Sequence, residues 1–235
     1  MESLNPVCIG IDVGQMSDPT AIAVTELARV ERNGRRDIDY VVRHLERLPL
    51  GTSYPAVAAR VASVLTSDIL KQRQRLVRID VTGVGRPVYE LIVAEVQSCP
   101  ETRSIRIAPI TFVHGEAFNE ATGKLGKAYL VSRLQALLQS GAIHAPDTPE
   151  VRVMIEELKV YEIRIDTDGK DTYGAFQVGK HDDLVTALGL TCLPQITGHA
   201  LLAEMKERMT VRGTIREKKV ETRARILENR YDWYW

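Results

Sequence analysis

The sequence predicts an α/β protein in which a mixed sheet, built from an antiparallel meander plus parallel strands, is flanked by helices and carries a β-hairpin insert. Three apolar, β-branched segments come first and are joined by polar turns, a pattern typical of a meander. Helical and strand-like segments then alternate, which favours parallel strands joined by crossover helices. Of the 235 residues, 44% are hydrophobic and 26% are charged. This composition excludes wholesale disorder.

The elements of the first half follow from this alternation. Short apolar runs predict strands, helical spacing of apolar residues predicts helices, and Pro55 and Pro87 suit first helical turns. We expect strands at 7–13, 20–30 and 39–48, a helix at 55–73, a strand at 76–81, a helix at 87–98 and a strand at 104–110.

The second half is predicted to be mainly helical. We expect helices at 127–139 and 149–158, a hairpin at 160–178 around the turn TDGKD, and a core helix at 182–193. These elements predict one domain over 1–198, followed by a charged helical C-terminal tail over 199–235.

Charge and cysteine content exclude several classes of protein. Lys plus Arg and Asp plus Glu both number 31, so any nucleic-acid binding needs a local basic patch. Cys8, Cys99 and Cys192 are too far apart for a disulfide framework or a cysteine zinc site. No segment resembles a signal peptide or a membrane span, so we expect a cytoplasmic protein without a membrane partner.

Carboxylates stand in unusual places in three segments. Asp12 lies within the apolar strand IGIDVG, Asp80 lies within VRIDVTG, and Asp182 and Asp183 begin the helix KHDDLVTALGL. A buried carboxylate is costly unless it is paired or bound to a cation. Each Asp alone is equally consistent with a capped turn, but together they can meet at one sheet edge. We expect them to be unpaired there and to hold Mg²⁺ or Mn²⁺.

Two such ions about 4 Å apart are suited to phosphodiester hydrolysis. Asp12, on the predicted central strand, is the candidate that bridges both ions. Asp80 and Asp183 would each hold one ion, and Asp182 would support them. The predicted catalytic residues are therefore Asp12, Asp80 and Asp183.

These segments resemble the nuclease domain of phage large terminase subunits, within the ribonuclease H-like superfamily. The three family motifs resemble GIDVGQMSDPTAIAV, RIDVTGVGRPVYELI and GKHDDLVTALGL, and GKAYLVSRLQALLQSGAIHAP resembles the helix before the family's hairpin insert. The resemblance covers about residues 7–193 and places the catalytic metals on Asp12, Asp80 and Asp183. It implies a ribonuclease H-like fold.

The resemblance also implies a biological role. The chain would cut concatemeric viral DNA during genome packaging, in the host cell cytoplasm, as an endonuclease on double-stranded DNA. A separate terminase ATPase, a small terminase subunit and a portal would be its partners. The sequence has no G-x-x-x-x-G-K-[ST] motif, so we do not expect this chain to drive DNA translocation.

Other residues are weaker candidates. Lys180 and His181 precede the acidic pair and are candidates to support the metal ligands or to contact the scissile phosphate. Lys124, Lys127 and Arg133 are candidates for DNA contacts, with solvated surface charges as the alternative.

Three rival functions remain open from the sequence. A Holliday-junction resolvase would use the same carboxylates on a different DNA shape. An actin-like or sugar-kinase ATPase has similar Asp-x-Gly loops, although that fold usually needs a longer chain. A non-catalytic DNA-binding module with a ribonuclease H-like core is the third alternative.

Overall fold

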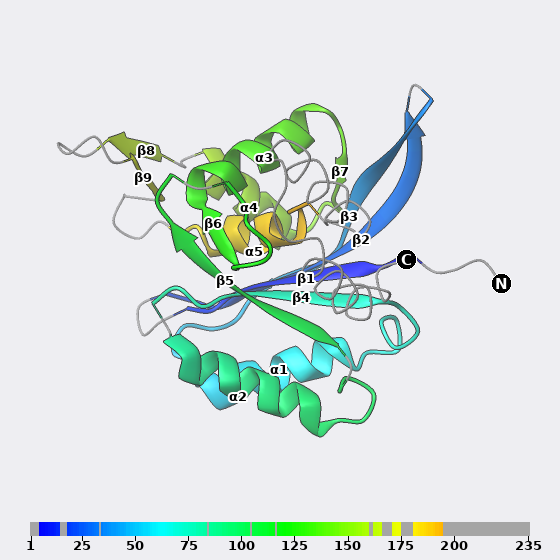
Figure 1. Ribbon diagram of the computed structural model, residues 1–235, viewed down its shortest axis with the longest axis vertical. Helices are drawn as coiled ribbons and strands as arrows, with labels where there is room; N and C mark the ends of the chain where they lie inside the picture. The colour runs from blue at the N-terminus through cyan, green and yellow to red at the C-terminus, as the bar shows by residue number, and fades with distance from the viewer. Residues whose placement is uncertain are drawn as a thin grey trace, which may run out of the picture. The chain divides into compact units, whose positions relative to one another are not determined.

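The computed structural model describes residues 5–14, 18–32, 34–83, 85–103, 105–115, 117–159, 162–165, 171–174 and 181–194. Helices and strands alternate along this part of the chain largely as the sequence predicts (Figure 1). The elements are β1 (Val7–Asp12), β2 (Ala21–Arg32), β3 (Arg35–Arg47), α1 (Tyr54–Leu65), β4 (Arg75–Asp80), α2 (Gly85–Ser98), β5 (Arg106–Val113), β6 (Lys124–Gly126), α3 (Lys127–Gln139), β7 (Ile143–His144), α4 (Pro149–Lys159), β8 (Glu162–Ile165), β9 (Asp171–Gly174) and α5 (Asp183–Thr191).

A mixed sheet forms the centre of the described region. Its seven strands lie in the order β6-β5-β4-β1-β2-β3-β7. Strands β1, β2 and β3 form the antiparallel meander, and β4 and β5 run parallel to β1. Five of the six residues of β1 are buried, as expected for a central strand that is covered on both faces. The predicted fold class is confirmed.

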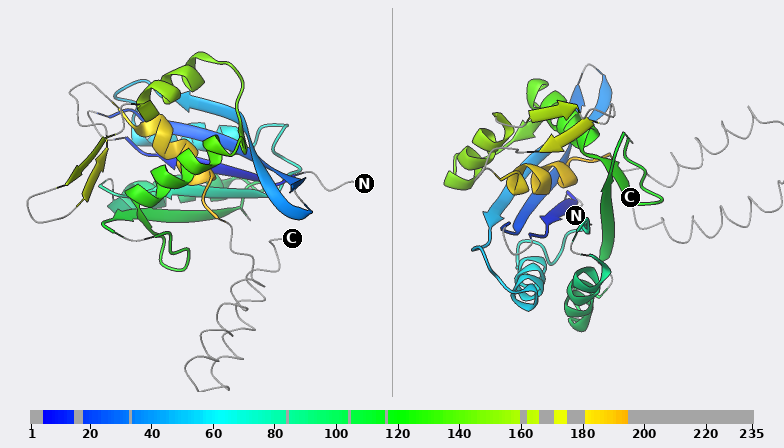
Figure 2. Two further views of the ribbon diagram at one scale, coloured as in Figure 1. Left: turned by 90° about the horizontal axis from the view of Figure 1, so that it is seen from above. Right: turned by 90° about the vertical axis from the view of Figure 1, so that its left-hand side faces the viewer.

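Helices cover both faces of this sheet (Figure 2). On one face, Val57, Val61 and Leu65 of α1 and Ile92 of α2 belong to a core cluster with the odd-numbered residues of β1. On the other face, α5 packs directly on β1. A Cβ at Gly10 would lie 2.0 Å from the backbone oxygen of Ala187, so only glycine permits this close approach.

The helix predicted at 55–73 ends earlier than expected. In the structure α1 ends at Leu65, and the hydroxyl of Thr66 donates a hydrogen bond to the carbonyl oxygen of Ala62. Hydroxyl groups that bond to the backbone compete with helix extension at such positions. Leu70 still reaches the core, being 4% exposed, which explains why the apolar pattern continues past the end of the helix.

The remaining differences lie at the edges. Strands β6 and β7 were not predicted, because segments of three and two residues are too short to show a period.

The predicted hairpin is confirmed, since β8 and β9 pair antiparallel from Glu162 with Gly174 to Ile165 with Asp171. The predicted C-terminal tail, 199–235, lies outside the described residues. No helix in the described part of the chain is both long and apolar enough to span a membrane.

Candidate active site

Strand register brings candidate residues from distant segments into one row across the sheet. Asp12, at the end of β1, lies directly beside Asp80 of the parallel strand β4. On its other side Asp12 pairs with Ala21 of β2, which in turn pairs with Arg47 of β3. Neighbouring strands are about 4.8 Å apart, so the two aspartates are immediate neighbours. The expected meeting of Asp12 and Asp80 at one sheet edge is confirmed.

Helix α5 supplies the other two carboxylates. Asp12 is two residues after Gly10 and therefore faces the same side of β1, which is the side covered by α5. Asp182 is the N-cap residue of α5 and Asp183 is its first residue. Negative side chains are favourable at this end of a helix because the macrodipole is positive there.

The pKa values of both strand carboxylates, Asp12 and Asp80, are raised. Burial raises the pKa of Asp12 well above its ordinary value, and the neighbouring carboxylate of Asp80 raises it further. Burial also raises the pKa of Asp80, although the backbone N–H of Thr82 donates a hydrogen bond of 2.7 Å to Asp80 Oδ1 and opposes that shift. Crowded carboxylates of this kind favour a bound cation.

The expectation that these carboxylates are unpaired is wrong for Asp182 and Asp183. Lys127 Nζ lies 2.8 Å from Asp182 Oδ2, and Arg47 Nε lies 2.7 Å from Asp183 Oδ2. Burial alone would lower the pKa of Lys127, but Asp182 and the other carboxylates outweigh this effect and raise it. Both cations come from segments far from the KHDD motif, so sequence proximity did not reveal them.

Arg47 also joins Asp183 to a second acid, Glu157, that was not a candidate from the sequence. Its guanidinium contacts Asp183 through two nitrogens and contacts Glu157 of α4 as well. Glu157 is only 6% exposed and accepts a hydrogen bond from the backbone N–H of Val185, in the first turn of α5. Burial and the charge of Asp183 raise the pKa of Glu157 to about 7, and burial raises that of Asp183.

The raised pKa of Glu157 predicts a pH-dependent stability difference between the wild type and Glu157→Gln. Between the ordinary value of 4.5 and the folded value of about 7, the folded protein holds a proton that the unfolded chain has lost. Wild-type stability therefore falls, relative to the variant, by on the order of 2–3 kcal/mol as the pH rises through this window. Urea denaturation of both proteins at pH 5 and pH 8 measures it. A constant difference between them at the two pH values contradicts the prediction.

The structure places the weaker candidates in different surroundings. His181 Nδ1 lies 3.7 Å from Asp18 Oδ1, and Lys180 lies outside the described residues. Arg133 donates hydrogen bonds to the carbonyl oxygen of Cys192 and to the hydroxyl of Tyr40, so it ties α3 to the end of α5 and to β3. Lys124 is exposed on β6, and its DNA contact stays a prediction.

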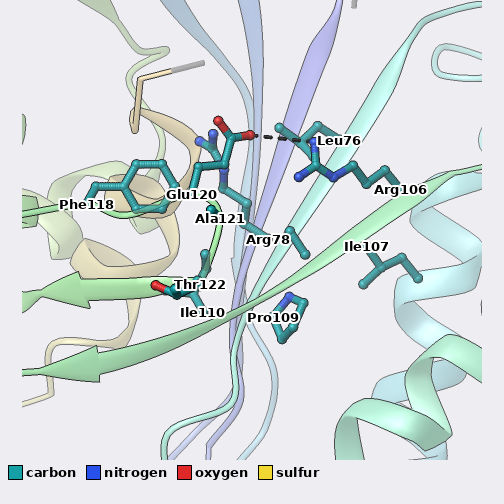
Figure 3. A pocket seen from close by; sticks show the side chains of 12 residues that line it. Leu76, Arg78, Arg106, Ile107, Pro109, Ile110, Phe118, Glu120, Ala121 and Thr122 are labelled. Carbon is teal, nitrogen blue, oxygen red and sulfur yellow. Dashed lines mark ion pairs between the residues drawn. The ribbon is translucent and has the colours of Figure 1, made fainter. Parts of the chain in front are cut away.

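A cavity of about 230 Å³ lies beside β4 and β5, but none of the four aspartates lines it (Figure 3). Arg78, 1% exposed, lines it and donates hydrogen bonds to the carbonyl oxygens of Leu190 and Leu193. Its guanidinium also lies 5.4 Å from the centre of the Phe118 ring. Arg78 therefore caps the C-terminal end of α5, which helps to hold that helix and its N-terminal acids in place on the sheet.

The donor chemistry of the site fits a divalent metal ion. Asp12, Asp80, Asp182 and Asp183 supply only carboxylate oxygens, which suit Mg²⁺ or Mn²⁺. Among the described residues, however, no group of three or more His, Cys, Asp or Glu side chains is arranged to hold a metal ion. Lys127 and Arg47 take up oxygens of Asp182 and Asp183, so metal binding at all four residues requires side chains to rearrange.

Comparison with solved structures identifies relatives of this fold. The large terminase nuclease from thermophilic phage G20c is 22% identical, with a TM-score of 0.56 over 80% of this chain and 81% of that chain. The same nuclease with bound magnesium aligns at a TM-score of 0.55 and 22% identity, over 80% of each chain. The HK97 bacteriophage large terminase is 12% identical, with a TM-score of 0.51 over 82% of this chain and 40% of that chain. These similarities show a shared fold.

A family model gives the more specific result. No curated protein sequence matches the chain significantly. The model of the terminase RNaseH-like domain, in contrast, matches residues 9–193. This match starts within β1 and ends two residues after α5, so it includes all four candidate aspartates. The chain therefore belongs to the family of terminase RNase H-like domains.

Proposed function

We propose that this chain is a metal-dependent endonuclease that hydrolyses phosphodiester bonds of double-stranded DNA during viral genome packaging. The observation that carries the proposal is the row formed by Asp12 and Asp80, with Asp183 of α5 at the same sheet edge. The membership in the terminase RNase H-like family supports the same function. A terminase ATPase, a small terminase subunit and a portal are the partners that this role implies.

Asp12, Asp80 and Asp183, supported by Asp182, would hold two Mg²⁺ or Mn²⁺ ions. When bound, such ions activate the attacking water and stabilise charge on the leaving oxygen. Asp12 stands on β1, which pairs with β4 and packs against α5, so it is the candidate that would be shared by both ions. The hydrogen bond from Thr82 N–H orients Asp80 through Oδ1, whereas Asp183 would have to exchange at least one of its two contacts with Arg47 for a metal ion.

Cleavage of supercoiled plasmid by the purified protein tests this function. We expect nicked and linear products in Mg²⁺ or Mn²⁺, and none in EDTA, because the carboxylates alone cannot activate water. Ca²⁺ serves as a non-supporting divalent control. A folded protein that cuts nothing in any of these metals would refute the proposal.

A four-way junction in the same assay addresses the resolvase alternative. A packaging nuclease is expected to cut linear duplex and junction DNA at similar rates, since the carboxylate row offers no group that reads DNA shape or base edges. Strong preference for the junction would instead favour a resolvase.

A further inference from the structure

Lys127 occupies an unusual position for a lysine. It is the first residue of α3, where the positive end of the helix dipole disfavours a cation, and no acidic residue lies in the first turn of this helix. Its side chain is only 29% exposed, so the ammonium is also partly removed from water. Neither local helix stability nor solvation explains a cation here.

The carboxylates of the candidate active site supply the compensation. Lys127 Nζ lies 2.8 Å from Asp182 Oδ2 and interacts electrostatically with Asp12 and Asp80. The ammonium also lies 5.6 Å from the centre of the Phe112 ring, whose face attracts cations. Lys127 therefore pairs directly with Asp182 and is stabilised by the nearby charges of Asp12 and Asp80.

Arg47, the second cation that the described residues bring to these carboxylates, cannot replace it. Arg47 is shared between Asp183 and Glu157, so its charge compensates those two carboxylates. Lys127 thus supplies the positive charge beside Asp12, Asp80 and Asp182. An ammonium has no lone pair to offer a metal ion and repels it by its charge. The Lys127 ammonium and a divalent metal ion therefore exclude each other at these carboxylate oxygens.

We propose that Lys127 is a built-in counterion that competes with one of the two divalent ions for Asp12, Asp80 and Asp182. It thereby lowers the metal affinity of the nuclease in the absence of DNA. This inference rests on the proposed metal-dependent function. Lysine suits the role, because its flexible four-carbon stem lets the ammonium leave the carboxylates when a divalent ion arrives.

Calorimetric titration with Mn²⁺ alone, without DNA, tests the competition in the 235-residue chain. Lys127→Met keeps the apolar stem and removes the charge, so we expect Mn²⁺ to bind at least about tenfold more tightly than to the wild type. Lys127→Arg keeps a cation and is expected to bind as weakly as the wild type. Lys159→Met is the matched control, because Lys159 also pairs with a carboxylate, Glu156, but both side chains are exposed.

Thermal unfolding gives a second measurement. In EDTA, Lys127→Met is expected to melt below the wild type, because the carboxylates lose their counterion. Saturating Mn²⁺ should then raise its melting temperature more than it raises that of the wild type. Tight binding together with this larger shift supports the proposal.

The outcomes separate this inference from the function on which it rests. Wild-type binding of Mn²⁺ with unchanged or weaker binding by Lys127→Met overturns the competition and leaves the metal site intact. Absence of Mn²⁺ binding in both proteins overturns the metal site and the competition together.

Discussion

Replacing Asp80 with Asn is expected to lower the rate of plasmid cleavage by at least about a hundredfold, because a neutral amide cannot replace a carboxylate as a metal ligand. The fold should survive the change. The amide oxygen of Asn can still accept the hydrogen bond that Thr82 N–H donates to Asp80 Oδ1. Burial raises the pKa of Asp80, so ionised Asp80 costs the folded state free energy that Asn does not.

The result to measure is therefore a loss of activity without a loss of stability. Cleavage assays in Mg²⁺ and Mn²⁺ give the first quantity, and thermal unfolding in EDTA gives the second. Asp68→Asn is the control, since the side chain of Asp68 is 95% exposed and pairs with Lys71 on the surface. Cleavage by Asp80→Asn at the wild-type rate would remove Asp80 from the proposed metal site. A variant that is inactive because it unfolds would instead assign Asp80 a structural role.

The strand aspartates and the acidic start of α5 were predictable from the sequence. Asp12 and Asp80 lie in apolar strands that were recognisable from their sequence pattern. That these two strands are direct neighbours was not predicted, because α1 connects β3 to β4 in the chain whereas β4 pairs with β1 in the sheet. The third motif likewise places Asp182 and Asp183 before an apolar helix that is buried along its length. In each case the local pattern carries the information.

The cations of the site were not predictable in the same way. Arg47 and Asp183 are 136 positions apart, and Lys127 and Asp182 are 55 positions apart, so their pairing depends on strand register and helix placement. Arg47 stands at the end of a meander strand that contains several other charged residues, and nothing local distinguishes it. Glu157 had one weak signal, its position on the apolar stripe of α4 with Val151 and Met154.

Removing Arg47 tests how the site tolerates its own negative charge. Arg47→Met is expected to cost about 3 kcal/mol of stability at pH 8, because Asp183 and Glu157 lose a shared partner and stay buried. Arg60→Met is the matched control. Arg60 also forms paired contacts with a carboxylate, Glu46, but its side chain is 40% exposed, so we expect a loss of about 1 kcal/mol or less.

The loss in Arg47→Met is expected to shrink at lower pH. Arg47 lowers the pKa values of Asp183 and Glu157, so its removal raises both values further above those of the unfolded chain. In the folded variant these acids then hold protons that the unfolded chain has released, and stability rises as the pH falls from 8 to 5. Urea denaturation at the two pH values measures this change. Adding Glu157→Gln to Arg47→Met removes one of the two unpaired charges and should recover part of the loss at pH 8. A loss that is independent of pH and unaffected by the second substitution would show that Arg47 contributes packing and not charge compensation.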